Sequence, residues 1–131
     1  MASRKILIVD DEVDVLSTLT AGLERWGFGV DAYNNPLAAL SNFKPKLYEV
    51  AILDFRMPQM NGFDMYRQLK KIDPNLRVCF LTAGEIYDVA YSDIISSIPA
   101  NCIIQKPVTN EELLTRINTI IDDSGSSKVL T

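Results

Sequence analysis

The chain has 131 residues, of which 47% are hydrophobic and 23% are charged, a composition typical of one globular domain and unlike that of fibrous, disordered or membrane proteins. Its formal net charge of −4 argues against sequence-independent binding of nucleic acid, which requires clustered Lys and Arg side chains. Because the sequence contains no histidine, it excludes a histidine phosphocarrier, a histidine-based catalytic triad and most zinc or haem sites.

The first half of the chain predicts two strand–helix units. Lys5–Val9 is an apolar run without polar alternation, typical of a parallel strand covered on both faces. This run also bears on localisation. Because it is too short for a signal peptide and ends in acidic residues, a cytoplasmic protein with no membrane association is expected.

The next strand and the first two helices follow the same logic. Phe28–Ala32 is a weaker strand, suited to a sheet edge, and Asn35 followed by Pro36 opens a second helix. The first helix has an apolar stripe that is expected in the core and consists of Val13, Leu16, Leu19, Leu23 and Trp26.

The second half repeats this alternation three times. Its strands are predicted at Val50–Leu53, Arg77–Leu81 and Cys102–Gln105. The third helix has a stripe of Phe63, Tyr66, Leu69 and Ile72. The fourth spans about Glu85–Ser97, and a capping box from Thr109 to Glu112 opens the fifth. Cys79 and Cys102 lie in apolar runs without metal-binding spacing, so both are expected to be reduced, buried packing residues.

Five alternations of strand and helix predict an α/β fold with right-handed crossovers, an open doubly wound parallel sheet with helices on both faces. Residues 1–122 are expected to form this single domain. Residues 123–131 lose helical periodicity and gain Gly and Ser, which predicts a flexible tail or the start of a linker to an effector domain.

Polar side chains follow four of the predicted strands: Asp10 and Asp11 after the first, Asp54 after the third, Thr82 after the fourth and Lys106 after the fifth. Ligands of such sheets bind beyond the carboxyl ends of the strands, so these side chains are expected at one site. Ionised carboxylates about 4 Å apart repel each other by about 4 kcal/mol in a partly polar environment, so they need cations. Lys106 supplies one positive charge, and a site with few carboxylate ligands suits Mg²⁺.

This combination is typical of a site that accepts a phosphoryl group. Held ionised by Mg²⁺ and Lys106, Asp54 can act as a nucleophile. Thr82 offers a hydroxyl and Ala83 a backbone N–H to the transferred group. Taken singly, Asp11 is more simply a helix cap and Asp54 a turn residue, so the prediction depends on the whole set.

Four segments, ILIVDDE, VAILDFRMPQMNG, VCFLTA and IIQKP, resemble in order and spacing the landmarks of CheY-like receiver domains of two-component response regulators. The resemblance covers about Arg4–Ile121. It implies a flavodoxin-like sheet of five parallel strands in the order 2-1-3-4-5. It also implies a cis peptide bond before Pro107.

The resemblance assigns a role to each candidate residue. Asp54 would be phosphorylated and would ligate Mg²⁺ together with Asp11 and the backbone carbonyl of Arg56, while Asp10 would assist through water. Thr82 and Lys106 would contact the phosphoryl group and relay its presence. The donor would be a partner histidine kinase or histidine phosphotransfer protein, since this chain has no histidine.

Two residues depart from the family pattern. Ile103 stands where many receivers have a Tyr or Phe that rotates inward on activation, so an aromatic switch at this position is excluded. Arg56 stands two residues after the phosphoacceptor, near the expected path of the hydrolytic water, and is hypothesised to change the rate of dephosphorylation.

The expected function is therefore a phosphorylation switch of protein interactions, and not a turnover enzyme. The output partner or effector domain stays unidentified, and a homodimer that forms on phosphorylation stays open. The alternative is an adaptor of the same fold that binds its partners constitutively, without phosphorylation. A haloacid-dehalogenase-type phosphatase is disfavoured because residue 56 is Arg, where its second aspartate would stand.

Overall fold

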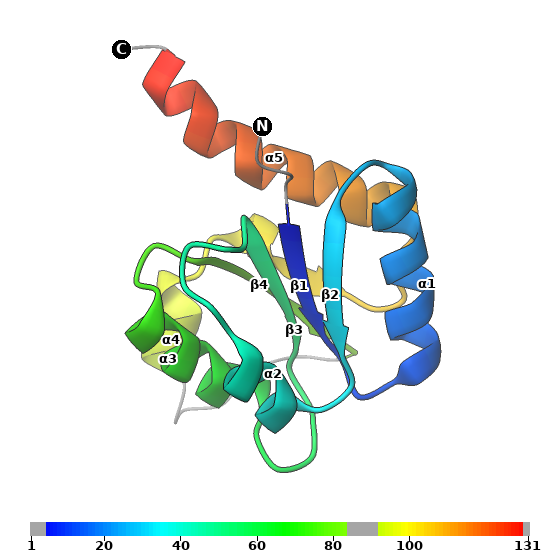
Figure 1. Cartoon of the computed structure of the whole chain (residues 1–131). Coiled ribbons are helices and arrows are strands. Elements are labelled where there is room, and N and C mark those ends of the chain that lie inside the picture. Colours follow the sequence, from blue (N-terminus) through cyan, green and yellow to red (C-terminus); the bar gives the residue numbers. More distant parts are fainter. Residues whose placement is uncertain (1–4, 84–91, 130–131) are drawn as a thin grey trace.

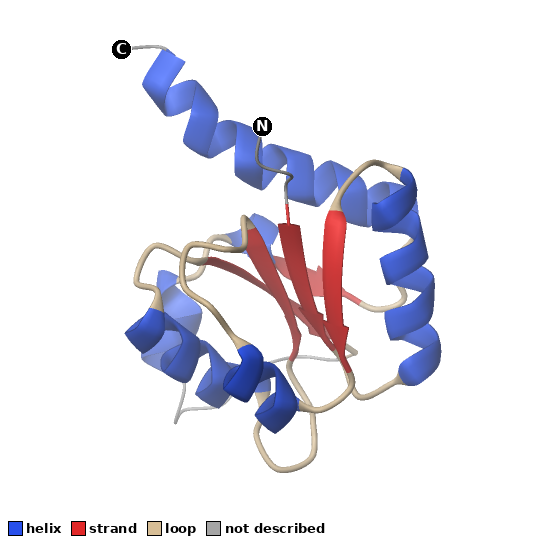
Figure 2. Ribbon diagram, in the orientation of Figure 1, coloured by secondary structure: helices blue, strands red, loops and turns tan. Residues whose placement is uncertain are grey.

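The computed structural model describes residues 5–83 and 92–129 and contains one five-stranded sheet. Its strands are β1 (Lys5–Val9), β2 (Gly29–Tyr33), β3 (Val50–Asp54), β4 (Arg77–Thr82) and β5 (Ile103–Gln105). They lie in the order β2-β1-β3-β4-β5 and pair in parallel (Figure 2). The predicted doubly wound fold and strand order are confirmed, and each predicted strand is found with bounds shifted by at most one residue.

Helices cover both faces of the sheet. They are α1 (Val13–Arg25), α2 (Pro36–Asn42), α3 (Gly62–Ile72), α4 (Ser92–Ser97) and α5 (Asn110–Val129), and a short 3₁₀ helix, η2 (Ala100–Cys102), precedes β5. Helices α1 and α5 lie on one face, and α2, α3 and α4 lie on the other (Figure 1). Each strand from β1 to β4 is thus followed by a helix that returns the chain to the start of the next parallel strand, and α5 follows the last strand.

Strand β1 shows why the central strands are apolar throughout. Its side chains alternate between the two faces, so that Ile6 and Ile8 pack with α1 and α5 while Leu7 and Val9 pack with α2 and α3. These four side chains are completely buried. A strand between two helical layers has no solvent-facing side, which accounts for the absence of polar alternation in the sequence.

The ends of α1 correct one prediction. Leu16, Leu19 and Leu23 of the apolar stripe are buried, but Val13 and Trp26 are each 58% exposed. A helix of 13 residues is about 20 Å long, whereas a five-residue strand spans about 17 Å, so the ends of α1 extend past the sheet that covers its middle. The expectation that Val13 and Trp26 are core residues is therefore wrong.

The other helix ends follow the predicted chemistry. The Asn35 carboxamide accepts hydrogen bonds from the backbone N–H groups of Leu37 and Ala38 at the start of α2. The Thr109 hydroxyl accepts one from the N–H of Glu112 at 3.1 Å, as the predicted capping box requires. In the fourth predicted helix, 92–97 are helical as α4, and 84–91 lie outside the described residues. The backbone of α5 continues to Val129, through residues predicted as tail or linker (Figure 1).

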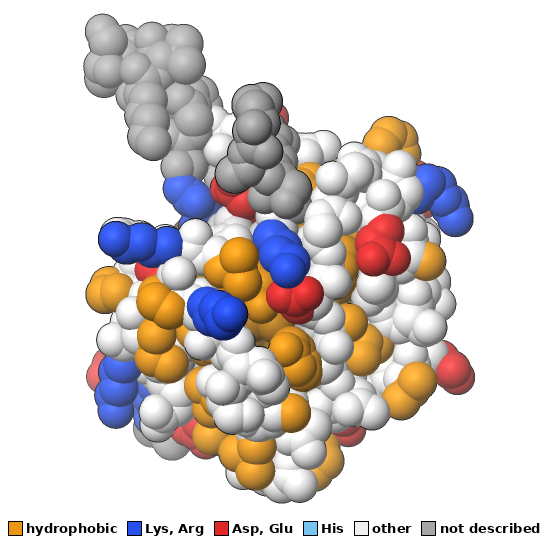
Figure 3. All heavy atoms as spheres, viewed as in Figure 1, with side chains coloured by type: hydrophobic (Ala, Val, Ile, Leu, Met, Phe, Trp, Pro, Cys, Tyr) orange, Lys and Arg blue, Asp and Glu red, His pale blue; other side chains and the backbone are white. Residues whose placement is uncertain are grey.

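Two surface properties bear on the expected partners. On the face shown in Figure 3, basic, acidic and hydrophobic side chains are interspersed, and the Lys and Arg side chains form no continuous patch there. Within the described ranges, no helix combines the length and the apolar character needed to cross a bilayer.

Candidate functional site

The carboxyl ends of the strands bring the predicted polar residues to one edge of the sheet. Asp10 directly follows β1, Asp54 and Thr82 are the last residues of β3 and β4, and Lys106 directly follows β5. The Lys106 N–H donates to the Thr82 carbonyl at 2.8 Å, which continues the β4–β5 pairing into the site. The Lys106–Pro107 peptide bond is cis, as expected.

Three of these side chains are buried despite their polarity. Asp10, Asp54 and Thr82 are 0%, 4% and 3% exposed. Carboxylates out of contact with water need cations or hydrogen bonds to remain ionised. The site therefore depends on the groups that lie against these two aspartates.

Lys106 is the cation at the centre of the site. Its ammonium nitrogen lies 3.0 Å from Asp10 Oδ2, 3.4 Å from Asp54 Oδ1 and 2.6 Å from Glu12 Oε1. Burial by itself would lower the pKa of Lys106, but the hydrogen bonds to Glu12 and Asp10 and the charge of Asp54 outweigh it, so the pKa is raised. Lys106 thus keeps its positive charge at physiological pH.

Lys106 does not fully neutralise Asp54. Burial, followed by the negative charge of Asp10 and the neighbouring Asp11 carboxyl group, raises the pKa of Asp54, while Lys106 lowers it. The net pKa is about 7, compared with the ordinary value of 3.8. Near neutral pH the carboxyl group is consequently divided between its protonated and ionised forms. A further cation at this edge would favour the ionised, nucleophilic form.

The carboxylates have the chemistry of a magnesium site. Asp10, Glu12 and Asp54 each offer an oxygen, and these oxygens lie within 4.8 Å of one another. Asp10 Oδ2 is buried, and among the described residues its polar contact is the Lys106 ammonium at 3.0 Å. Several carboxylate oxygens beside an open cleft suit a hard divalent cation that retains water ligands.

Glu12 is the member of this group that the sequence analysis missed. The pattern of strand ends selects the acidic pair Asp10 and Asp11 and gives Glu12 no role. The signal was its place directly after the pair, one residue before α1 begins. The Glu12 N–H donates to Asp10 Oδ1 at 2.8 Å, and this turn directs the Glu12 side chain back toward Lys106.

Asp11 and Arg56 line the same opening without being buried. The cleft has a volume of about 290 Å³, and its walls are Asp11, Glu12, Asp54, Phe55, Arg56, Thr82, Ala83 and Lys106. Asp11 is exposed and lies near enough to Asp54 to raise the pKa of that carboxyl group. The Arg56 guanidinium lies 5.6 Å from the centre of the Phe55 ring. Most of the predicted site residues therefore line one cleft, and Asp10 lies behind it in an ion pair with Lys106.

Gly62 holds the loop after β3 close to Asp54. Its N–H donates to the Phe55 carbonyl at 2.8 Å, and a Cβ at this position would stand 2.6 Å from the backbone oxygen of Asp54. Asn61 caps α3 by accepting a hydrogen bond from the Asp64 N–H at 2.8 Å. The Asn61–Gly62 pair thus brings the start of α3 against the end of β3, because only glycine permits that approach.

Ile103 lies away from the cleft. It pairs with Phe80 across β4 and β5 and packs, partly buried, with the residues under α3 and α4. The described part of β5, Ile103–Gln105, contains no aromatic residue.

A family profile and the similar proteins of known sequence all indicate the same family for this chain. The profile of the response regulator receiver domain matches residues 6–118. The chain is 34% identical over 123 residues to the transcriptional regulatory protein CpxR homolog of Haemophilus influenzae, and 31% identical over 122 residues to the transcriptional regulatory protein CreB of Escherichia coli. These alignments cover 93% and 92% of this chain and 52% of each relative, so the chain spans about half the length of these relatives.

Solved structures show the same likeness. A response regulator receiver domain protein from Clostridium thermocellum superimposes with a TM-score of 0.76 and 30% identity, covering 98% of this chain and 99% of the other. The CheY-like receiver domain protein from Methanospirillum hungatei superimposes with a TM-score of 0.79 and 25% identity, covering 95% of this chain and 98% of the other.

Proposed function

Because the chain belongs to the response regulator receiver domains of two-component systems, we propose that it accepts a phosphoryl group on Asp54 and thereby switches its interactions with other proteins. The observation that carries the proposal is the placement of Asp54. Its buried carboxyl group ends a central strand, opens onto a cleft and lies 3.4 Å from the ammonium group of Lys106.

The chemistry assigned to Asp54 is nucleophilic attack on phosphorus. An Asp54 oxygen forms a bond to the phosphorus of a phosphohistidine while the P–N bond breaks, and the leaving imidazole takes up a proton. Because the protonated carboxyl is a poor nucleophile, transfer requires the ionised form of a group whose pKa is about 7 here. Holding that form is the role assigned to the cations of the cleft.

Lys106, Thr82 and Ala83 are assigned to the phosphoryl oxygens. The phosphoryl group adds negative charge to the cleft. Lys106 would therefore move its ammonium group from the carboxylates toward the phosphoryl oxygens. The Thr82 hydroxyl and the Ala83 N–H would donate hydrogen bonds to the same group. Support comes from the position of all three on the wall of the cleft that contains Asp54.

Magnesium is the cofactor proposed for this site. Asp10, Asp11 and Asp54, with the backbone carbonyl of Arg56, are the proposed ligands, and Glu12 joins them as a candidate because its carboxylate belongs to the same group. When bound, Mg²⁺ would neutralise charge on the carboxylates and on the phosphoryl oxygens. The closeness of the Asp10, Glu12 and Asp54 oxygens, within 4.8 Å of one another around a single ammonium group, supports a further cation here.

The phosphoryl donor is proposed to be a histidine kinase or histidine phosphotransfer protein, because this chain has no histidine. Phosphorylation would then favour one of two surface states, through contacts that Thr82 and Lys106 make only with the phosphoryl group. The output partner, or an effector domain like those implied by the greater length of the relatives, would bind one of these states. This protein would act in the cytoplasm, where such donors are found.

Incubation with acetyl phosphate and Mg²⁺, followed by intact mass measurement, tests phosphoryl acceptance. The expected result is a gain of one phosphoryl group that is absent from Asp54→Asn and from samples with EDTA. Asp64→Asn is the matched control, since Asp64 is a half-buried carboxylate on α3 that does not line the cleft, and its loss should leave the gain unchanged. No gain in the wild-type protein, or an equal gain in Asp54→Asn, would defeat the proposal.

A second experiment separates the switch from the constitutive adaptor. Partners are captured with the protein in the presence and absence of beryllofluoride, and size-exclusion chromatography of the same samples reports any homodimer. A switch predicts different partner sets or oligomeric states with and without beryllofluoride. Identical results would support the adaptor.

A further inference from the structure

Cys79 and Cys102 stand side by side at the other end of the β4–β5 pair. Phe80 is the register partner of Ile103, so the residues directly before them, Cys79 and Cys102, are neighbours across the two chain segments. Paired strands lie about 4.8 Å apart, within the Cα separation of about 4.4–6.8 Å that a disulfide spans. Both residues are free cysteines and belong to the core layer beneath α1 and α5.

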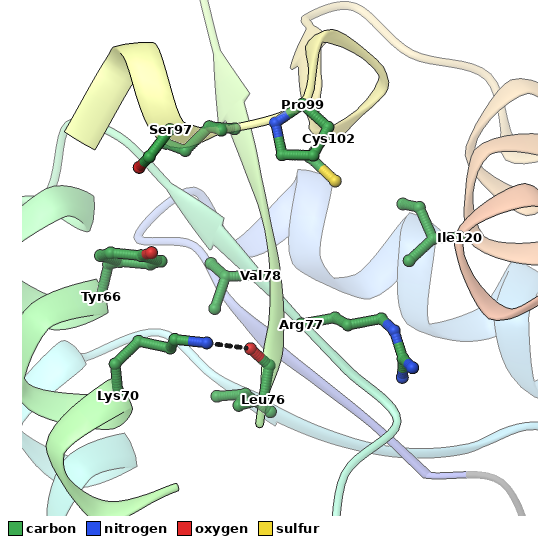
Figure 4. Close-up of a pocket in the computed structure, with 10 residues that line it drawn as sticks. Tyr66, Lys70, Leu76, Arg77, Val78, Ser97, Pro99, Cys102 and Ile120 are labelled. Carbon is green, nitrogen blue, oxygen red and sulfur yellow. Dashed lines mark hydrogen bonds between the residues drawn. The ribbon is translucent and has the colours of Figure 1, made fainter. Parts of the chain in front are cut away.

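The two thiols differ in their access to solvent. Cys102 lines a pocket of about 510 Å³ whose walls include Tyr66, Lys70 and Ile120, whereas Cys79 does not line it. In Figure 4 the Cys102 sulfur points from η2 into the space bordered by Val78 and Ile120. A small molecule that enters this pocket therefore meets Cys102 first.

The electrostatic surroundings of the two thiols also favour Cys102 as the reactive sulfur. The interaction between the two neighbouring thiols, together with burial, raises the pKa of Cys79, whereas the same interaction lowers the pKa of Cys102 against the opposing effect of burial. The positive charge of Arg116 also lowers the pKa of Cys102, and the Arg116 guanidinium is held near it by a 3.4 Å hydrogen bond to the Ile103 carbonyl. Access through the pocket and the direction of the pKa change therefore both point to Cys102 as the more reactive thiol.

We propose that Cys102 is a site of oxidation by hydroperoxides and that Cys79 is the thiol that resolves the oxidised form into an intrachain disulfide. In the first step the Cys102 sulfur attacks a peroxide oxygen, an S–O bond forms and the O–O bond breaks. The Cys102 sulfur is oxidised by two electrons to a sulfenic acid, and the peroxide leaves as water or an alcohol after taking up a proton. In the second step the Cys79 sulfur attacks the Cys102 sulfur, and the sulfenic oxygen leaves as water with the Cys79 thiol proton.

The disulfide would join β4, which ends at Thr82, to the segment that leads through β5 to Lys106. Cys79 lies three residues before Thr82 on β4, and Cys102 directly precedes β5, which Lys106 follows. The crosslink would therefore restrain any relative movement of these strands. The oxidation itself is independent of the proposed phosphorylation, because neither cysteine lines the cleft that contains Asp54.

Treatment of the reduced full-length chain with hydrogen peroxide in the presence of EDTA tests the site. The expected product has lost two hydrogen atoms, joins the peptides that contain Cys79 and Cys102, and returns to the starting mass with dithiothreitol. A native chain that keeps both thiols, while the urea-unfolded chain is oxidised, would overturn the proposal.

Single variants test the order of the two steps. In Cys79→Ala the sulfenic acid should persist on Cys102 and be trapped by dimedone. In Cys102→Ala, dimedone should label Cys79 on the order of tenfold less, because Cys79 is fully buried and holds its proton. Equal labelling of the two variants would show that neither thiol is favoured and would contradict the inference.

The wild-type protein provides a test that does not depend on folding of a variant. Brief alkylation of the native, reduced chain with iodoacetamide, followed by peptide mapping, should modify Cys102 before Cys79. The reverse order would overturn the assignment of Cys102 as the reactive thiol.

Discussion

The two ends of the β4–β5 pair bury opposite kinds of chemistry. At the carboxyl end, Thr82 and Lys106 meet a group of carboxylates, and two of those carboxylates are almost completely buried. Toward the amino end, Cys79 and Cys102 lie in an apolar layer, next to each other and near the Arg116 guanidinium. The same two strands therefore support an ionic site and a sulfur site.

The comparison shows what each kind of burial requires. Ionised carboxylates lose hydration when buried, and their stability then depends on neighbouring cations and on pH. Thiols are weakly polar and pack like small hydrophobic groups, so they can be buried without a neighbouring cation and over a wide pH range. The carboxylate end should accordingly respond to Mg²⁺ and pH, and the sulfur end should respond to changes in packing.

Replacement of Lys106 by Met should have the largest effect on stability. It leaves the Asp10 and Asp54 carboxylates buried without their cation, and we expect the free energy of unfolding in EDTA to fall by about 3–5 kcal/mol. Urea denaturation measures the change, and Mg²⁺ should restore part of the loss.

Lys70→Met is the matched control for Lys106→Met. The Lys70 ammonium donates only to the backbone carbonyls of Pro74 and Leu76 among its described contacts, near the sulfur end, and its loss should cost about 1 kcal/mol without dependence on Mg²⁺. If both variants lost the same free energy of unfolding, the buried carboxylates would not depend on Lys106 as their cation.

Asp54→Asn should raise the stability of the metal-free protein. The pKa of Asp54 is raised on folding from 3.8 to about 7, so folding favours the protonated form. The protonated Asp54 carboxyl group therefore contributes to the stability of the folded protein. This contribution is fully present below pH 3.8 and is lost as the pH rises through about 7. Above that range the variant should be more stable than the wild type by about 2 kcal/mol, because it lacks the buried charge.

Urea denaturation of both proteins across this pH range, in EDTA, measures the Asp54 contribution as the difference between them. The difference should grow as the pH rises and shrink when Mg²⁺ is added. A difference that does not vary with pH would show that Asp54 ionises in the folded protein as easily as in the unfolded chain.

Cys79→Ala should cost about 1 kcal/mol, because it removes a buried sulfur from the core beneath α1 and α5. The loss should be the same with Mg²⁺ and with EDTA. A loss that changes with Mg²⁺ would show that the two ends of the β4–β5 pair are coupled and do not respond independently.

Arg56→Ala should have the smallest effect on stability, within about 0.5 kcal/mol, because Arg56 is an exposed side chain that lies over the Phe55 ring. If Asp54 is phosphorylated as proposed, its dephosphorylation rate should change a few-fold, since Arg56 lines the cleft where water would reach the phosphoryl group. An unchanged decay of the phosphoprotein, followed by intact mass, would rule out this role. Arg67→Ala, on the exposed surface of α3, is the control.

Much of the fold and of the site could be predicted from the sequence, for one physical reason. Parallel strands covered on both faces must be apolar throughout, so each strand is visible as a run and its end is marked by the first polar residue. The carboxyl ends of such strands meet at one edge. Asp10, Asp54, Thr82 and Lys106 could therefore be grouped without knowledge of any distance.

Other features depended on which side chains meet across the sheet and how far each element extends. Glu12 reaches Lys106, 94 residues away, because the turn after β1 points it there. Trp26 continues the apolar stripe of α1 but is exposed, because the helix is longer than the sheet beneath it.

The sequence by itself determined which residue types stand at the strand ends, and with them the family and the chemistry of the carboxylate end. Only the tertiary structure decided the register of β4 and β5, which places Cys79 beside Cys102, and the pocket that exposes one of the two sulfurs. Hydrophobic periodicity reports the environment of each residue along its own element, whereas register and access are properties of two or more elements packed together.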